Sequence, residues 1–168
     1  MECITEKTVE QTWQAIAQMA PDAAASEMMS FASDQPHLLG FVTAFLDDLQ
    51  DDARDMGTYL LFVVYKMFEN STNDKIPRIQ PETIITQYEA NQEFLLSADM
   101  DNDTSMEEMA ALESSKQPWV FQYVTDALLE EDDDDVPEEE QVSLCEEEFG
   151  EILLLLKTAM DVLDAATN

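Results

Sequence analysis

Proline placement constrains the fold of this 168-residue chain more than any other feature. Five of the six prolines stand just before or at an amphipathic run, namely Pro21, Pro36, Pro81, Pro118 and Pro137. Proline suits the first turn of a helix because its missing N–H has no intrahelical partner there. Each of these prolines therefore predicts the start of a helix. The three glycines and the scarcity of β-branched runs argue against an all-β fold.

The spacing of apolar residues predicts about eight helices. The expected ranges are about 8–20, 22–33, 38–49, 56–67, 81–97, 105–114, 118–130 and 137–164. Trp13 and Ile16 lie on the apolar face of the first, and Ile85 and Tyr88 on that of the fifth. The fourth is apolar on nearly every side across 59–68, so we expect it at the centre. The fold class is all-α, as a helical bundle or a short array of α-α repeats.

Two stretches of the chain resemble each other. "QPHLLGFVTAFLDD" (35–48) and "QPWVFQYVTDALLE" (117–130) share Gln-Pro, an apolar pair, an aromatic residue and Val-Thr. Each is followed by acids and then by a strongly apolar helix with one lysine, Lys66 or Lys157. The stretches are 82 residues apart and the lysines 91, so the second copy carries nine extra residues within "EEDDDDVPEEE".

This similarity predicts an internal duplication. We expect a single domain over 1–168, built from two tandem four-helix units at about 1–74 and 75–168. The units would share one core, because each is too small to bury its apolar face alone. The second unit would carry an acidic insertion near 130–140. The alternative is chance similarity between amphipathic helices, since Gln-Pro openings are common.

The charge is strongly one-sided. The chain has 38 acidic and 7 basic residues, for a formal net charge of −31. Direct binding to nucleic acids or to anionic membranes depends on basic patches, so the composition argues against both. No apolar run approaches the roughly 20 residues of a membrane helix, and the N-terminus has no signal pattern. Cys3 and Cys145 do not form a disulfide framework or a metal motif, which favours a reducing, cytoplasmic location.

One acidic stretch, "ADMDNDTSMEE" at 98–108, has the alternating carboxylates of a calcium loop. Asp99, Asp101 and Asp103 fit positions 1, 3 and 5 of an EF-hand, which also needs glycine at position 6 and glutamate at position 12. Those two positions hold Thr104 and Ala110. The three aspartates are therefore weak metal candidates. We expect a solvated acidic turn, with Thr104 as the cap of the next helix, and a protein without a cofactor.

A second acidic cluster, "DDLQDDARD", sets Asp47, Asp51 and Asp55 four residues apart. On one continuous helix these carboxylates would repel one another. A break near Gln50 is therefore expected, because it would move Asp51 to the positive end of the next helix dipole.

Residues that could carry enzyme chemistry are sparse. His37, the only histidine, lacks the Glu-x-x-His partner that a ferritin-type di-metal site requires. Its counterpart in the second copy is Trp119, which indicates a packing role. Cys145 has helical spacing to Phe149 and is predicted in the core. No nucleophile–base set or glycine-rich phosphate loop occurs, so we expect no enzymatic activity.

The strongest candidate for partner recognition is a run of six consecutive acids. These are Glu130, Glu131, Asp132, Asp133, Asp134 and Asp135. Such runs are usually solvated and often serve as interaction segments. The leading hypothesis is a non-enzymatic acidic helical module that binds a basic protein, with acids steering the encounter and a helix groove giving specificity. The alternatives are a nucleic-acid mimic that inhibits a DNA- or RNA-binding protein, and a metal-dependent or other enzyme with a scattered carboxylate site.

Overall fold

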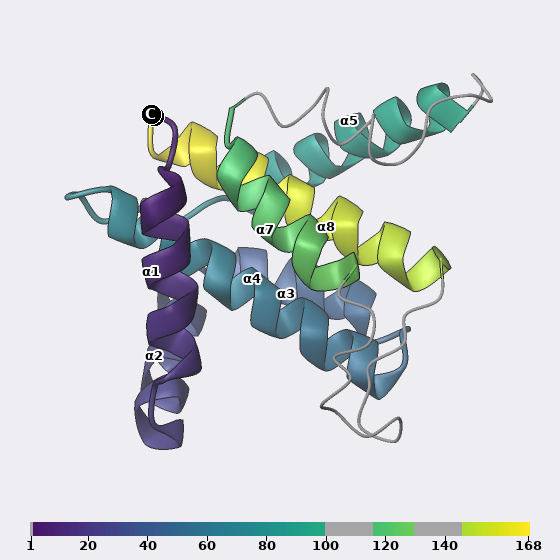
Figure 1. Cartoon of the computed structure of the whole chain (residues 1–168). Coiled ribbons are helices and arrows are strands. Elements are labelled where there is room, and N and C mark those ends of the chain that lie inside the picture. The colour runs from purple at the N-terminus through teal and green to yellow at the C-terminus, as the bar shows by residue number, and fades with distance from the viewer. Residues whose placement is uncertain (1, 100–115, 130–145) are drawn as a thin grey trace.

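The computed structural model describes residues 2–99, 116–129 and 146–168 (Figure 1). All regular secondary structure in these residues is helical, so the all-α class is confirmed. The helices are α1 (Glu6–Ala17), α2 (Pro21–Asp34), α3 (Pro36–Leu46), α4 (Asp51–Ser71), α5 (Pro81–Asp99), α7 (Pro118–Leu129) and α8 (Glu146–Ala166). The helix expected near 105–114 lies outside the described residues. Within these ranges, no helix has both the length and the apolar character of a membrane span.

Helix starts follow the sequence prediction closely. α2, α3, α5 and α7 each begin at a proline, whereas Pro137 lies outside the described residues. The expected break is present, because Gln50 is the extended residue before α4 and Asp51 stands in its first turn. A carboxylate is favourable there, close to the positive end of the helix dipole. Thr5 caps α1, with its Oγ1 accepting a hydrogen bond of 3.2 Å from the N–H of Thr8.

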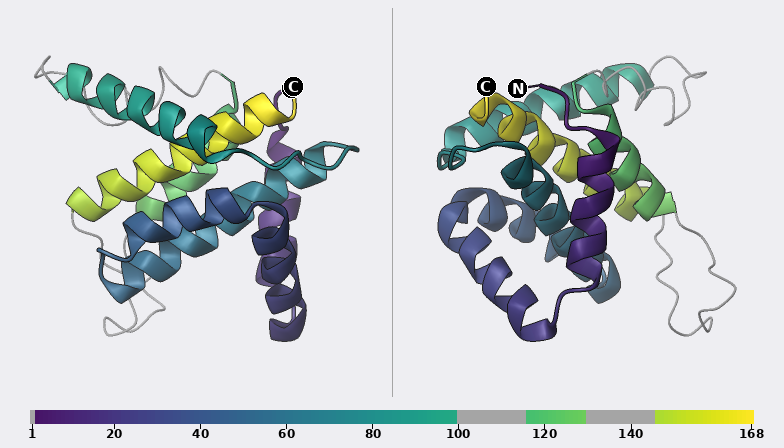
Figure 2. Two further views of the ribbon diagram at one scale, coloured as in Figure 1. Left: turned by 180° about the vertical axis from the view of Figure 1, so that it is seen from behind. Right: turned by 60° about the vertical axis from the view of Figure 1, so that its left-hand side comes forward.

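Helices α4 and α8 form the centre of the fold. They run in the same general direction and contact each other, with α7 on one side and α3 on the other (Figures 1 and 2). α1 lies against α4 and α7, and α5 lies against α8 and α3. α4 buries apolar residues around most of its circumference, including Leu60, Leu61, Val63, Val64 and Phe68. The predicted central position of the fourth helix is therefore confirmed.

Gln35 holds the extended segment that leads into α5. Its side chain is fully buried, just before the first residue of α3. The Nε2 donates to the carbonyl of Pro77 at 2.9 Å, and the Oε1 accepts from the N–H of Ile79 at 3.0 Å. Because an unpaired buried backbone group is costly, these bonds fix the direction in which α5 starts.

Gln117 holds the segment that leads into α1. Its Oε1 accepts from the N–H of Ile4 at 2.8 Å, and its Nε2 donates to the buried carboxyl of Asp164 in α8 at 2.8 Å. The same Nε2 lies 3.4 Å from the carbonyl of Glu2. The N-terminal segment is thereby tied to α7 and to the last turn of α8, as the adjacent chain ends in Figure 2 illustrate.

The buried face of α5 differs from the prediction by one position. Ile84, Tyr88 and Asn91 are buried, whereas Ile85 is exposed. Periodicity could not choose between the adjacent isoleucines, because Tyr88 lies within one turn of both. In the fold, Ile84, Tyr88 and Asn91 form the face of α5 that packs inward.

α2 contacts the rest of the fold chiefly through Phe31, its buried residue. The Phe31 ring stacks on Tyr65 of α4, with centroids 4.5 Å apart and planes at 27°. Beside it, Lys66 of α4 donates to Glu27 of α2 at 2.7 Å and also pairs with Glu69. Contacts of Phe31 with the rings of Tyr65 and Phe62 and one ion pair thus join α2 to the central helix.

Two buried tyrosines and one partly buried lysine link stability to alkaline pH. Burial, with a smaller effect of Glu69, raises the pKa of Tyr65 to about 12. Burial and the neighbouring carboxylate of Glu151 raise the pKa of Tyr88 to about 12. Burial alone would lower the pKa of Lys66, but hydrogen bonds to its two glutamate partners raise it above its ordinary value.

All three raised pKa values stabilise the fold below the pKa of the unfolded chain, and this stability is lost as pH rises through the folded values. The free energy of unfolding should therefore fall between about pH 10 and 12. Each tyrosine contributes at most about 3 kcal/mol. Urea unfolding at several pH values measures the loss, and tyrosinate absorbance should show Tyr65 and Tyr88 ionising above the pH at which a free tyrosine does. Four tyrosines that ionise together near pH 10 would contradict the expectation.

Candidate functional site

Most residues predicted to form a site lie outside the part of the chain that the structure describes. Asp99 is the last residue of α5, whereas Asp101 and Asp103 lie outside the described residues. The acidic run 130–135 and Cys145 also lie outside them. Among the residues described, no cluster of three or more His, Cys, Asp and Glu side chains could hold a metal ion. The acidic run therefore stays a prediction.

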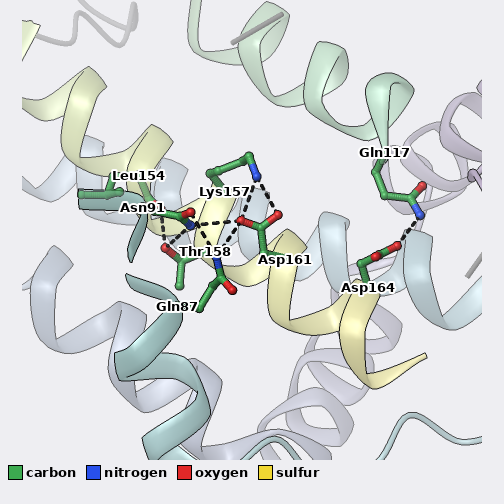
Figure 3. Close-up of polar contacts among 8 residues, drawn as sticks. All are labelled: Gln87, Asn91, Gln117, Leu154, Lys157, Thr158, Asp161 and Asp164. Atoms are coloured by element: carbon green, nitrogen blue, oxygen red, sulfur yellow. Dashed lines mark hydrogen bonds and ion pairs between the residues drawn. The ribbon is translucent and has the colours of Figure 1, made fainter. Parts of the chain in front are cut away.

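A continuous polar network joins α5 to α8 (Figure 3). The Nδ2 of Asn91 donates to the hydroxyl of Thr158 at 3.2 Å and to the carboxylate of Asp161 at 3.1 Å. Gln87, one turn earlier, donates to the Oδ1 of Asn91 at 3.1 Å and to Asp161 at 3.3 Å. Lys157 donates to both oxygens of Asp161 at 2.6 and 2.7 Å. The network places amide, hydroxyl, ammonium and carboxylate groups in one interface.

These groups satisfy one another, so the network is structural. The hydroxyl of Thr158 donates to the carbonyl of Leu154 at 2.9 Å. Throughout the described ranges, every buried side-chain nitrogen and oxygen has a hydrogen-bond partner. A ligand site needs polar groups that point into open space, whereas fully paired groups rigidify an interface. The network therefore fixes α5 against α8.

An open groove of about 240 Å³ lies between α1 and α7. It is lined by Trp13, Trp119 and Tyr123, by the acids Glu6, Glu10 and Asp126, and by Val9 and Gln122. Trp13 and Trp119 are 37% and 39% exposed. Trp13 stacks on Tyr123 with ring centroids 6.4 Å apart and planes at 20°. Both tryptophans of the chain therefore stand in one groove.

The rim of this α1–α7 groove is negative. Glu6 and Glu10 stand one turn apart on α1, and Asp126 lies on α7. No lysine or arginine is among the residues that line the groove. Basic residues that form ion pairs elsewhere in the described ranges are Arg54, Lys66, Lys75 and Lys157. Aromatic faces and uncompensated carboxylates favour a cation with a flat or apolar body.

A second hollow of about 430 Å³ lies between the end of α3 and the start of α8. Its lining residues are Phe45, Asp48, Leu49, Gln50, Glu147, Glu148 and Glu151. Its aromatic residue, Phe45, packs against Tyr88 with centroids 4.9 Å apart, and the hydroxyl of Tyr88 donates to Glu151 at 3.4 Å. This hollow adds to the acidic surface but lacks the paired exposed tryptophans of the α1–α7 groove.

The aromatic residues of the groove lie in other surroundings than the sequence predicts. The packing role predicted for His37 and Trp119 is wrong, because both are exposed. Trp13 was expected on the buried face of its helix but lies beside that face, in contact with Tyr123. The sequence does show that each tryptophan stands on a predicted helix that also carries acidic residues. Periodicity within one helix cannot indicate that two helices far apart in the sequence meet.

Comparisons of the chain with models of protein families, with curated proteins and with solved structures find no match. The chemistry of the groove is therefore the basis for inferring a function. Aromatic faces, three carboxylates and a lining without basic residues define the group that the groove suits. That group is positively charged and carries a flat or apolar body.

Proposed function

We propose that the chain is a non-enzymatic, acidic interaction module that binds a basic segment of a protein partner in the α1–α7 groove. The groove carries the proposal because it joins two exposed tryptophans to three carboxylates. Tryptophan and tyrosine supply much of the energy at protein interfaces, because they bury a large area at low entropic cost. The carboxylates favour basic segments over acidic ones.

The charge of the whole chain supports the same partner. At a net charge of −31, the chain attracts basic proteins over a distance set by the Debye length, about 10 Å at 0.1 M salt. Such steering raises the association rate more than the affinity. We propose that the acidic run 130–135 adds to this attraction, whereas the groove determines which basic segment is held.

Tryptophan fluorescence gives a direct readout of binding. The probe is a helical peptide with leucines on one face and basic residues on the other. We expect it to change the tryptophan emission and to bind more weakly as salt is raised. Trp119→Ala should weaken binding about tenfold, the effect of losing an interface tryptophan. Tyr59→Ala removes a similarly exposed aromatic from α4 and should bind as wild type.

Charge variants separate the groove from the general acidity. Glu10→Gln should slow association at low salt more than Glu89→Gln does, although both remove one exposed carboxylate. Glu89 lies on α5, outside the groove residues. Equal binding of a peptide whose basic residues are replaced by glutamate would contradict the proposal, as would no binding of the basic peptide.

We further propose that the fold is an internal duplication, with units at about 1–74 and 75–168 within one domain. Support comes from the reciprocal glutamines that precede α3 and α7. Gln35 of the first unit holds the segment before α5, the first helix of the second. Gln117 of the second unit holds the segment before α1, the first helix of the first. Each unit would thus complete the other.

Two further contacts of α1 recur in α5 at positions 75 residues later. They are the ring pair Trp13–Tyr123, matched by Tyr88–Phe41, and the hydrogen bond Thr12–Asn70, matched by Gln87–Asp161. Chance similarity between amphipathic helices gives no reason for the same positions to contact corresponding partners. The recurrence therefore favours duplication over that alternative.

A further inference from the structure

On the basis of the proposed function, we infer that the α1–α7 groove selects arginine, and that one arginine of the partner lies with its guanidinium against the tryptophan rings. The inference rests on two kinds of group in one groove. Trp13 and Trp119 are each more than a third exposed. Glu6, Glu10 and Asp126 offer carboxylates around them.

A guanidinium uses both kinds of group at once. It is planar and weakly hydrated, so its face stacks on an aromatic ring while its edge donates to carboxylates. The ammonium of lysine is compact and strongly hydrated, so it loses more solvation on approaching a ring and cannot donate in a bidentate manner. Carboxylates alone would attract either cation. The rings are what discriminate in favour of arginine.

The two rings have different surroundings in the groove. Trp13 lies beside Tyr123, with ring centroids 6.4 Å apart and planes at 20°. Trp119 stands in the first turn of α7, immediately after Pro118. Glu6 and Glu10, one turn apart on α1, are spaced so that two edges of one guanidinium can be reached from the same helix.

The corresponding contact between α3 and α5 lacks the groups that would bind a cation in this way. At the positions of the acids Glu6, Glu10 and Asp126 it has Pro81, Ile85 and Ala44, by the offsets of 75 and 82 residues along the chain. Its aromatic residues pack on one another, with Phe41 and Tyr88 centroids 5.4 Å apart. The chain should therefore bind one such arginine, not two.

Calorimetry with two probe peptides tests the inference. The peptides have the same length and charge, and carry either arginine or lysine at every basic position on a leucine-bearing helix. The arginine peptide should bind wild type about tenfold more tightly, with one peptide per chain. Trp119→Ala should bring the two affinities together, whereas Glu10→Gln should weaken both peptides and preserve most of their ratio. Circular dichroism checks that each variant is folded.

The outcomes separate this inference from the proposed function. If both peptides bind wild type equally and Trp119→Ala weakens them equally, the groove binds basic segments but does not select arginine. If two arginine peptides bind per chain, the distinction between the α1–α7 groove and the α3–α5 contact is wrong. If neither peptide binds, the proposed function and the inference both fail.

Discussion

Gln117→Leu is expected to lower the free energy of unfolding by about 3–4 kcal/mol, a large share of the 5–15 kcal/mol typical of a domain. The substitution leaves the N–H of Ile4 and the buried carboxyl of Asp164 without their partner. A buried polar group that loses its partner bears its full desolvation cost, which is higher for a carboxyl group than for an amide. Urea unfolding followed by circular dichroism measures the loss.

Two further variants show whether the hydrogen bonds cause the effect. Gln35→Leu removes the hydrogen bonds to the backbone of Pro77 and Ile79, but it leaves no buried carboxyl group without a partner. The free energy of unfolding should therefore fall by less, about 2 kcal/mol. Asp164→Leu, added to Gln117→Leu, should restore part of the stability, because it replaces both partners by apolar groups. A loss below about 1 kcal/mol for Gln117→Leu would show that water replaces the glutamine at little cost.

Phe31→Ala is expected to cost about 3–5 kcal/mol, the usual range for removing a buried phenylalanine. Phe31 is 1% exposed and contacts the rings of Tyr65 and Phe62 at 4.5 and 6.4 Å between centroids. Since it is the buried residue of α2, the loss should fall first on that helix. Hydrogen exchange across residues 21–34 should accelerate more than exchange in α4.

Met29→Ala is the matched control in the same helix. Met29 is 74% exposed, so its removal should change neither the unfolding midpoint nor the exchange of α2. If hydrogen exchange in the Phe31→Ala variant accelerates equally in α2 and α4, then α2 unfolds only together with the core and the prediction is wrong.

The helices could be predicted because the residues that favour a helix start lie within a few positions of that start. Each proline marks a position where the backbone N–H is dispensable, and Asp51 marks the favourable end of a dipole. The repeated Gln-Pro pair is visible in the sequence, but the hydrogen bonds of Gln35 and Gln117 to distant backbone are not. A buried side chain that pairs with distant backbone leaves no periodic trace in the sequence.

The groove could not be predicted for the same reason. Trp13 and Trp119 meet only because α1 and α7 cross in the folded chain, and the sequence between them gives no indication of that crossing. Apolar periodicity also assigns a tryptophan to the core by default, since a large ring usually gains most from full burial. Here each ring is partly buried, and the exposed remainder forms the candidate site.

The bond between Ile4 and Gln117 spans 113 residues and has a consequence for how the chain is made. Ribosomes add residues from the N-terminus, so the segment that leads into α1 emerges long before the glutamine that holds it. The part of the apolar surface of α4 that α8 covers stays open until α8 has been synthesised. Truncated products of translation that lack α8 would therefore expose that surface to proteases, whereas a chain that includes α8 covers it.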